Sequence, residues 1–413
     1  MTKPHPDTVT ANGRDYCWPD RPLVVICLDG CEPDYITQAV IAGVAPTLAR
    51  FCEKGSSLNA ECAMPSFTNP NNLSIVTGAP PSVHGICGNY FLDPERGEEV
   101  MMNEPHYLRC DTLLARFAEA GGAVAVITAK DKLRTLLGKG LQGICFSAER
   151  ANELTLAGNG ITGVLDRVNL PLPSVYSQAL SEFVFAAGAV ILRAHRPDIL
   201  YLSTTDYIQH KHAPGTAQAN AFYAMLDPYL ATFEELGARI AITADHGMNA
   251  KTDAAGQAQI IYLQDWFDRH LGSALARVIL PITDPYIAHH GSLGSFATVY
   301  LPTGTDASAI ATELARLTGI ESVLTRPEAA LELELPADRI GDLVVIAERL
   351  QVLGTTASRH DLSGLDAPLR SHGGRSEQIV PMLFSHPLAA LEAGKRWRNF
   401  DIFDLALNHR RPA

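Results

Sequence analysis

Aspartates and histidines recur in the sequence in short stretches whose residue types suit a metal ion. They are Asp29, Asp206 with His210, Asp245 with His246, and His372. Carboxylate and imidazole ligands without a thiolate suit zinc best, and manganese or iron less well. Three aspartates and two histidines, joined by a third histidine and a bridging group, are enough for two ions. Two ions about 3.5–4 Å apart stabilise both the attacking and the leaving group of a phosphoryl displacement.

Each stretch also has a purely structural interpretation when it is taken alone. Asp29-Gly30 and Asp245-His246-Gly247 have the composition of turns. Asp206 and His210 have the spacing of a pair on one helix face, which fits either a surface hydrogen bond or two ligands of one ion. A single histidine such as His372 is usually a satisfied polar residue. The metal interpretation gains from all four stretches following predicted strands. His84 and His212 are set aside as structural, since neither is needed to complete two sites.

The segment 64–78 adds a hydroxyl group at the expected start of a helix. Thr68 is predicted to cap this helix, and Pro70 is tolerated in its first turn. A hydroxyl at this place faces the positive end of the helix, where an anionic phosphoryl group would bind. A metal bound to the threonine oxygen would favour the alkoxide. The alternatives are a plain capping threonine and the competing hydroxyl of Ser66, which lies further from the helix start.

Short apolar runs precede most of these polar residues and predict buried strands. The predicted strands cover 23–28, 123–128, 199–202 and 240–243. The predicted helices cover 44–54, 109–120, 173–195 and 218–236. Strands that alternate with helices form a mostly parallel sheet with helices on both faces, and ligands collect at the carboxyl ends of its strands. We therefore expect an α/β fold with the candidate residues along one edge of the sheet.

Residues 255–350 have a different pattern, with mixed runs and turns rich in proline and glycine. Runs at 296–301 and 343–346 predict strands, and 306–318 predicts a helix. We expect a smaller α+β cap inserted into the core. The catalytic core would then consist of residues 1–254 and 351–413, with 370–385 returning to the core and 400–407 forming a closing helix.

Charge and composition limit the partners of the chain. The 413 residues include 33 Lys+Arg and 45 Asp+Glu, and 33 − 45 gives a net charge of −12. This balance argues against nucleic-acid and membrane-surface binding, but it allows a small anionic substrate. We find no apolar run of the roughly 18 residues that a membrane span needs, and no signal peptide. The eight irregularly spaced cysteines predict buried free thiols. We expect a cytoplasmic protein, with a homodimer as one option.

Taken together and in order, the candidate residues resemble the alkaline phosphatase superfamily. The matching pieces are Asp29, the run TNPNNLSIVTG at 68–78, the run PSVHG at 81–85, Asp206 with His210, Asp245-His246-Gly247, and His372-Gly373-Gly374. The set extends through nearly the whole chain and is far more specific than any single piece. It is most similar to the branch of nucleotide pyrophosphatases/phosphodiesterases and phosphonoacetate hydrolases. The fold that this resemblance implies is an α/β/α sandwich with a mostly parallel central sheet and a cap near the site.

The resemblance also implies a role for each residue and two zinc ions per chain. One zinc ion would be held by Asp206, His210 and His372. The other would be held by Asp29, Asp245 and His246. Thr68 would be the nucleophile, bound to and activated by metal, and Asn89 matches an asparagine that binds a phosphoryl oxygen in this branch.

Two lysines narrow the expected substrate. Lys130 and Lys132 follow a predicted strand and look like the lysine pair of phosphonoacetate hydrolases. Two lysines could simply be solvated charge, but a place at the carboxyl end of a strand favours binding. Arg370 and Arg375 flank His372 and are weaker anion-binding candidates.

The expected reaction is zinc-dependent hydrolysis of the carbon–phosphorus bond of phosphonoacetate, a small anionic phosphonate, to acetate and phosphate. Thr68 would attack phosphorus and form a phosphothreonine, which water then hydrolyses. The carbon leaving group is tolerable only if its charge spreads into the adjacent carboxylate, and a lysine or zinc held against that carboxylate stabilises it.

Three other functions stay open at this point. A phosphodiesterase or nucleotide pyrophosphatase shares the metal site and differs in the pocket for the leaving group. A relative of cofactor-independent phosphoglycerate mutase fits less well, because that branch uses serine. A non-catalytic, metal-stabilised binding protein fits least, because a pure binder does not need the Thr68 hydroxyl.

Overall fold

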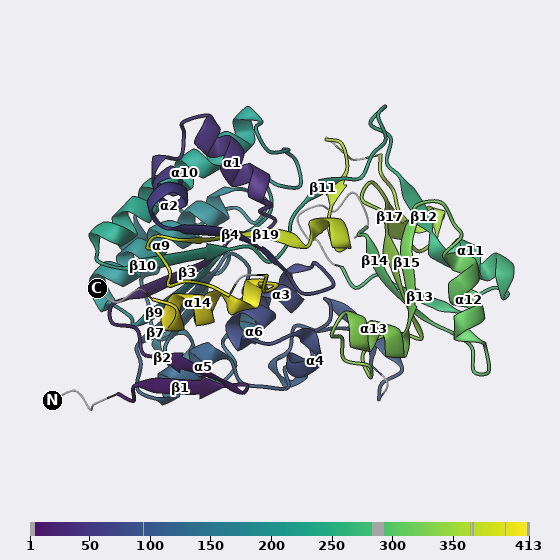
Figure 1. Ribbon diagram of the computed structural model, residues 1–413, viewed down its shortest axis with the longest axis horizontal. Helices are drawn as coiled ribbons and strands as arrows, with labels where there is room; N and C mark the ends of the chain where they lie inside the picture. The colour runs from purple at the N-terminus through teal and green to yellow at the C-terminus, as the bar shows by residue number, and fades with distance from the viewer. Residues whose placement is uncertain are drawn as a thin grey trace.

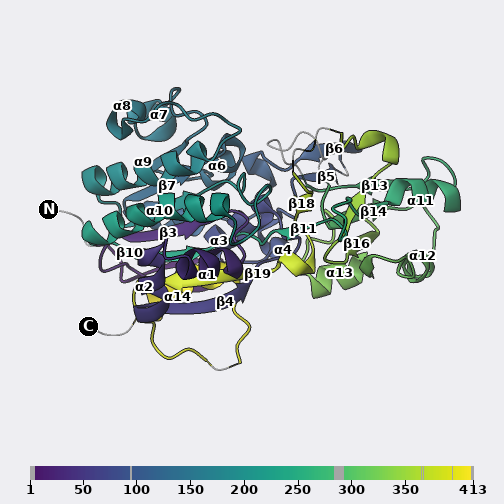
Figure 2. The same ribbon diagram turned by 90° about the horizontal axis from the view of Figure 1, so that it is seen from above.

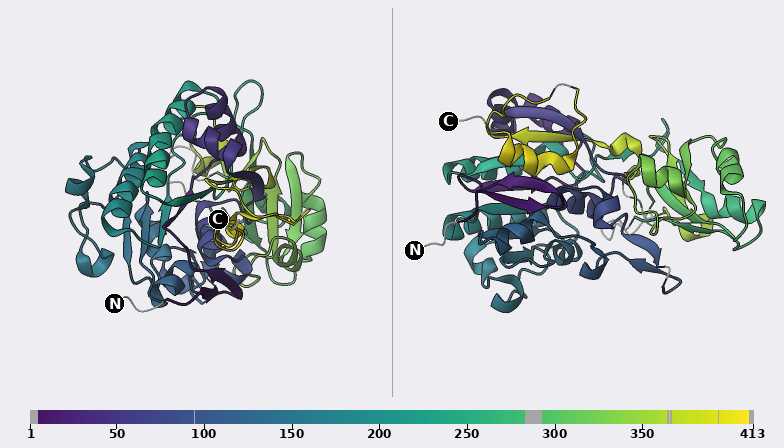
Figure 3. Two further views of the ribbon diagram at one scale, coloured as in Figure 1. Left: turned by 60° about the vertical axis from the view of Figure 1, so that its left-hand side comes forward. Right: turned by 60° about the horizontal axis from the view of Figure 1, so that its bottom comes forward.

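The computed structural model describes residues 5–93, 95–282, 293–363, 365, 367–392 and 394–410. A larger α/β lobe carries the central sheet, and a smaller lobe is built from residues between 260 and 354 (Figure 1). The first and last described residues both lie at the end of the larger lobe that is far from the smaller one (Figures 1 and 3).

Seven strands form the central sheet. Their order is β4 (Ser56–Glu61), β19 (Ile379–Phe384), β10 (Arg239–Thr243), β3 (Leu23–Cys27), β9 (Ile199–Ser203), β7 (Val124–Thr128) and β8 (Ile144–Ser147). The strands from β10 to β8 pair in parallel, whereas β19 runs antiparallel to both of its neighbours. Strands β3, β7 and β9 are fully buried, as their largely apolar sequences predict for a sheet covered on both faces.

Helices cover both faces of this sheet, so the predicted α/β/α sandwich is confirmed (Figures 1 and 2). One layer contains α1 (Pro33–Ile41), α2 (Pro46–Lys54), α9 (Ala179–His195) and α10 (Ala217–Glu235). The other layer contains α3 (Thr68–Thr77), α5 (Leu113–Glu119), α6 (Asp131–Leu137) and α14 (Ile402–Asn408).

Two predicted helices begin four or more residues later than their sequence patterns indicate. Helix α5 starts at Leu113 instead of 109, because the Thr112 side chain accepts a hydrogen bond from the Ala115 amide and so caps the helix. Helix α9 starts at Ala179 instead of 173. The prolines at 171 and 173 disfavour helical backbone in the residues before them.

The remaining elements outside residues 260–354 are short. The short strands form two hairpins, β1 (Thr8–Ala11) with β2 (Arg14–Cys17) and β5 (Tyr90–Asp93) with β6 (Glu98–Met101), and one further pair, β11 (Asn249–Ala250) with β18 (Arg370–Ser371). The short helices are α4 (Pro81–His84), α7 (Leu156–Asn159) and α8 (Val164–Val168). The 3-10 helices are η1 (Pro105–Tyr107), η2 (Ala357–Arg359), η3 (Arg375–Glu377) and η4 (Asn399–Asp401).

The smaller lobe has a sheet and an apolar core of its own. Its antiparallel strands run in the order β13 (Arg277–Ile279), β14 (Phe296–Tyr300), β16 (Leu343–Ala347) and β15 (Ile320–Thr325). The other elements are α11 (Leu263–His270), α12 (Ala307–Leu314), α13 (Arg326–Glu332) and the parallel pair β12 (Ile260–Tyr262) with β17 (Val352–Gly354). The division at 255 and 350 remains a proposal, and the pairing of β17 with β12 argues for placing the second border after residue 354.

Within the described ranges, no helix is both long and apolar enough to cross a membrane. All eight cysteines are free thiols. The prediction that they are buried holds for Cys27, Cys31, Cys62, Cys87 and Cys145. It is wrong for Cys52, which is exposed, and only partly right for Cys17 and Cys110.

Candidate metal centre

Three neighbouring strands bring the three candidate aspartates together. Asp29, Asp206 and Asp245 follow the carboxyl ends of β3, β9 and β10, and each side chain is almost fully buried. The spacing of Asp206 and His210 fitted one face of a helix, but the described structure has no helix at this place. A single turn replaces it, in which the His210 amide donates to the Asp206 carbonyl at 3.0 Å, and this turn places both side chains on one side.

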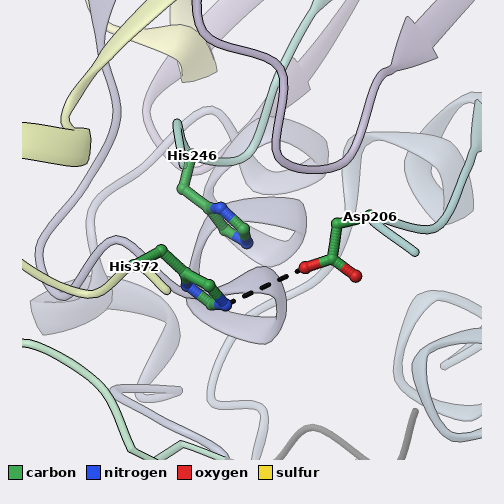
Figure 4. A group of neighbouring side chains, drawn as sticks. All are labelled: Asp206, His246 and His372. Atoms are coloured by element: carbon green, nitrogen blue, oxygen red, sulfur yellow. Dashed lines mark ion pairs between the residues drawn. The ribbon is translucent and has the colours of Figure 1, made fainter. Parts of the chain in front are cut away.

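The ligand atoms form two overlapping groups that could each hold a metal ion. Within each group the atoms lie within 4.8 Å of one another. One group consists of Asp29, Asp245 and His246, as expected. The other consists of Asp206, His246 and His372 (Figure 4). His246 is therefore a member of both groups. His210, which the resemblance assigns to the second group, has its Nε2 2.9 Å from Asp206 Oδ2.

All three histidines are oriented in the same way by the backbone. Their Nδ1–H groups face carbonyl oxygens of Arg370 at 3.0 Å, Gly247 at 2.9 Å and Ser66 at 2.8 Å, for His210, His246 and His372 respectively. With Nδ1 as the donor, the lone pair lies on Nε2, which faces the aspartates. A histidine fixed through one ring nitrogen in this way is the usual arrangement of a metal ligand.

The electrostatics of this cluster favour a bound cation. Burial, followed by the charges of Asp206 and Asp245, raises the pKa of Asp29 well above its usual range. Burial and the charge of Asp206 raise the pKa of Asp245 to about 7. Neither carboxylate oxygen of Asp29 accepts a hydrogen bond from the described part of the chain. Buried carboxylates this close together are stable when a positive charge is shared between them, so the residues fit a metal.

Asp245 is held in place by a residue that the sequence argument did not single out. The Asn72 amide donates to Asp245 Oδ2 at 3.2 Å, and the Tyr201 hydroxyl donates to Asn72 Oδ1 at 2.7 Å. Asn72 lies one turn after Thr68 on α3, so helical periodicity gave a signal that it shares the Thr68 face.

Thr68 lies at the metal groups, but not as the cap that we predicted. Phe67 is the N-cap, and Thr68 is the first residue of α3. Asn71 secures this turn instead, because its amide donates to the carbonyls of Ala63, Pro65 and Phe67. The Thr68 hydroxyl is thereby left to face the metal groups, with Oγ1 3.3 Å from His246 Nε2. The competing Ser66 hydroxyl is fully buried and donates to the Gly374 carbonyl.

A cavity of about 270 Å³ opens beside the metal groups. Thr68, Asn89, Lys130 and Lys132 all line it, so the structure brings the four expected substrate contacts together. Lys130 is the inner lysine, with Nζ 3.9 Å from Asp206 Oδ1. Lys132 is exposed at the rim. The cavity is also lined by residues that were not predicted from the sequence as substrate contacts, namely Asn69, Met101, Asn103, Leu133, Glu149, Val175 and Tyr176.

Arg370 and Arg375, the weaker anion-binding candidates, are not among the residues that line this cavity. The Arg370 guanidinium is buried and donates to the carbonyls of Gln209 and Met248 at 2.8 and 3.0 Å. It thereby connects the loops that carry His210 and His246. Arg375 pairs with Glu332 and lies 3.6 Å from Glu321, both in the smaller lobe. Adjacency to His372 in sequence therefore did not place either guanidinium at the cavity.

Two glycines in the motifs allow the close approach of these loops. Gly30 has a φ of +71°, and a Cβ there would lie 2.9 Å from Asp206 Cβ. Gly373 has a φ of +111°, and a Cβ there would lie 2.4 Å from Phe67 Cε1. Both positions favour glycine through conformation and through space.

His84 is structural, as expected, and its protonation predicts how the free energy of unfolding depends on pH. Its Nδ1 accepts from the Ile86 amide at 3.1 Å, and its Nε2–H donates to Ser74 Oγ at 2.9 Å. Burial, and then Arg339, lowers the pKa of His84 from 6.5 to about 3. The unfolded chain therefore binds a proton in this range that the folded chain does not. We expect the free energy of unfolding to fall from pH 6.5 toward 3, with His84 contributing up to about 4 kcal/mol.

Denaturant titrations from pH 7.5 to 4 check this prediction. Carboxylates also titrate in acid, so the measured quantity is the difference in slope between the wild type and His84→Gln. The variant should be less stable at neutral pH and should lose stability less steeply below pH 6.5. Equal slopes would contradict the assignment.

The site and the fold agree with comparisons to known proteins. Residues 23–375 match the type I phosphodiesterase/nucleotide pyrophosphatase family, and the chain belongs to this family. It is more specifically similar to phosphonoacetate hydrolase from Sinorhizobium meliloti 1021 in complex with phosphonoacetate. The two share 54% identity over 98% of this chain and 100% of the other, with a TM-score of 0.94. The complex of the same enzyme with phosphonoformate gives a TM-score of 0.95. The expected superfamily is confirmed.

A more distant solved structure agrees in fold, and a curated relative matches over a short stretch of sequence. Murine ectonucleotide pyrophosphatase/phosphodiesterase 5 is 16% identical over 95% of this chain and 96% of its own, with a TM-score of 0.62. An uncharacterised pyrophosphatase/phosphodiesterase of Schizosaccharomyces pombe is 36% identical over 86 residues. This match covers 20% of the present chain and only 16% of the yeast protein.

Proposed function

We propose that the protein hydrolyses the carbon–phosphorus bond of phosphonoacetate to acetate and phosphate. The observation that carries this proposal is that Thr68, Asn89, Lys130 and Lys132 line one and the same cavity beside the metal groups. It holds a nucleophile, an amide donor and two cations, which are the groups that a short, doubly anionic substrate requires. The 54% identity to an enzyme crystallised with phosphonoacetate supports the same substrate.

We propose two zinc ions per chain, bound by residues that already face one another. Asp29, Asp245 and His246 would hold one ion, and Asp206, His210 and His372 the other. When bound, the ions would lower the pKa of the Thr68 hydroxyl and balance the charge of the phosphonate. Histidine nitrogens mixed with carboxylates favour zinc over the hard cations magnesium and calcium.

The protein's own residues supply the reacting and stabilising groups for each step of the proposed hydrolysis. The Thr68 oxygen attacks phosphorus, and the Asn89 amide donates to a phosphoryl oxygen. The carbon–phosphorus bond breaks, and its electron pair passes to the CH2 carbon and spreads into the substrate carboxylate. Lys130 stabilises that charge. The Thr68 hydroxyl releases its proton to solvent on attack, and the carbon takes up one proton from solvent to give acetate. Water then hydrolyses the phosphothreonine, which releases phosphate and restores the hydroxyl.

The two lysines are expected to differ in importance. Lys130 is only 19% exposed and lies 3.9 Å from Asp206, whereas Lys132 is exposed at the rim. A cation in a drier environment stabilises developing charge more strongly. We expect Lys130→Met to lower kcat/KM for phosphonoacetate by about 10²-fold or more, and Lys132→Met to have a smaller effect, mainly on KM. Steady-state kinetics of the zinc-loaded variants measure this, and a larger loss in Lys132→Met would reverse the assignment.

A phosphodiesterase activity is the second candidate, because the matching family is named for it. Both activities would use the same nucleophile and metals, so the leaving-group pocket decides between them. Zinc-loaded protein should be assayed side by side with phosphonoacetate and an aryl phosphodiester. A preference for the diester would contradict the proposed substrate but not the family. The cytoplasmic location and the homodimer remain predictions from the sequence.

A further inference from the structure

A buried ion pair lies behind the metal groups, outside the cavity that would hold the substrate. Lys251 Nζ and Glu377 Oε1 are 2.8 Å apart, and both side chains are completely inaccessible to solvent. Removing two charges from water costs several kcal/mol per ion, and apolar residues often stabilise a fold equally well. A buried pair at this position therefore calls for an explanation beyond stability.

The Glu377 carboxylate connects the two loops that carry His246 and His372. Its Oε2 accepts from the amide of Gly374, two residues after His372, at 2.9 Å. Its backbone carbonyl accepts from the amide of Gly247, the residue after His246, at 2.7 Å. One residue thus contacts the backbone beside both histidines.

Three further donors fix the carboxylate itself. Its Oε1 accepts from Asn249 Nδ2 at 2.8 Å, from Lys251 Nζ at 2.8 Å and from Ser376 Oγ at 2.6 Å. Burial raises the pKa of Glu377, but Lys251, Ser376 and Asn249 together outweigh this effect, and the pKa lies below its usual value. The carboxylate is therefore ionised at neutral pH and remains a strong acceptor for the Gly374 amide.

We infer that Glu377, fixed by Lys251 and Asn249, is a positioning residue that sets where His246 and His372 present Nε2 to the metal groups. The two imidazole rings already stack in parallel, with centroids 3.7 Å apart and planes 6° apart. The His372 ring is held on its other side by the Ser66 carbonyl, so a shift at Gly374 changes the direction of Nε2. The inference rests on the proposed zinc site, but not on the identity of the substrate.

The test is the zinc affinity of Glu377→Gln. An amide in place of the carboxylate presents NH2 either to the Gly374 amide or to Lys251, so one of these donors loses its acceptor. We expect zinc affinity, measured by titrating metal-stripped protein with zinc against a chromophoric chelator, to fall by about 10- to 100-fold. Glu377→Asp keeps the charge opposite Lys251 but is one CH2 too short to reach Gly374. It should fold and also lose affinity, so it answers the same question if Glu377→Gln aggregates.

Asp227→Asn is the matched control for a general loss of stability. The Asp227 carboxylate is also buried and accepts two backbone amides, those of Thr47 and Leu48, at 2.9 Å. It lies on α10, and these hydrogen bonds tie it to α2 instead of a metal-binding loop. This variant should unfold more easily and keep zinc affinity within about twofold of the wild type.

Each outcome is decisive. Wild-type affinity in Glu377→Gln, or an equal loss in Asp227→Asn, would overturn the positioning role while leaving the proposed function in place. A wild-type protein that binds no zinc would contradict the proposed function, and the positioning role would fall with it.

Discussion

Thr68→Ala is expected to lower phosphonoacetate turnover by at least about 10⁴-fold in zinc-loaded protein, because it removes the nucleophile of the proposed covalent route. The Thr68 hydroxyl lies 3.3 Å from His246 Nε2 and makes no capping bond, so its loss removes the reacting oxygen and leaves the helix start intact. The Asn71 amide still holds the turn. The effect should therefore appear in kcat, with little change in thermal stability.

Thr68→Ser is the matched variant, because it keeps the hydroxyl and loses only a methyl group. It should retain far more activity than Thr68→Ala. Zinc content must be measured in both variants, since Thr68 is also expected to contact the metal. Near-native turnover by zinc-loaded Thr68→Ala would refute the phosphothreonine route.

Removal of the metal is expected to lower turnover strongly and, separately, to lower the free energy of unfolding. Without cations, three buried carboxylates repel one another, and the Asp29 oxygens have no hydrogen-bond donor among the described residues. Loss of the charge that balances the phosphonate should cost several kcal/mol in the transition state, which is on the order of 10³-fold or more. Free zinc at 100 times its dissociation constant should stabilise the folded protein by about 2.7 kcal/mol.

A chelator titration followed by metal addition tests this prediction. Zinc should restore both turnover and thermal stability, whereas magnesium or calcium should restore neither, because these cations prefer oxygen ligands. His372→Ala should bind less zinc and should not be rescued by the concentration that rescues the wild type. Full activity in protein shown to be free of metal would end the bimetallic proposal.

The sequence predicted the elements that follow from local pattern. Fully buried runs such as β3 and β7 are apolar and rich in β-branched residues, a pattern that favours interior strands of a covered sheet. Because adjacent parallel strands end at one edge, the placement of Asp29, Asp206 and Asp245 followed from this pattern. The spacing of Asp206 and His210 was less informative, because four residues along the chain separate two side chains on one side of a single turn as well as on one face of a helix.

Tertiary structure alone decided how these residues act together. The carbonyls that orient His210 and His372 belong to Arg370 and Ser66, 160 and 306 residues away along the chain. The assignment of Arg370 to structure, of Lys130 to the inner cavity and of Glu377 to the histidine loops depends in the same way on distant contacts. Residue types and their periodicity are local properties, so the sequence determined the chemical class of the site and its edge of the sheet. The direction of each side chain depends on packing between segments far apart in the chain, and no local pattern encodes it.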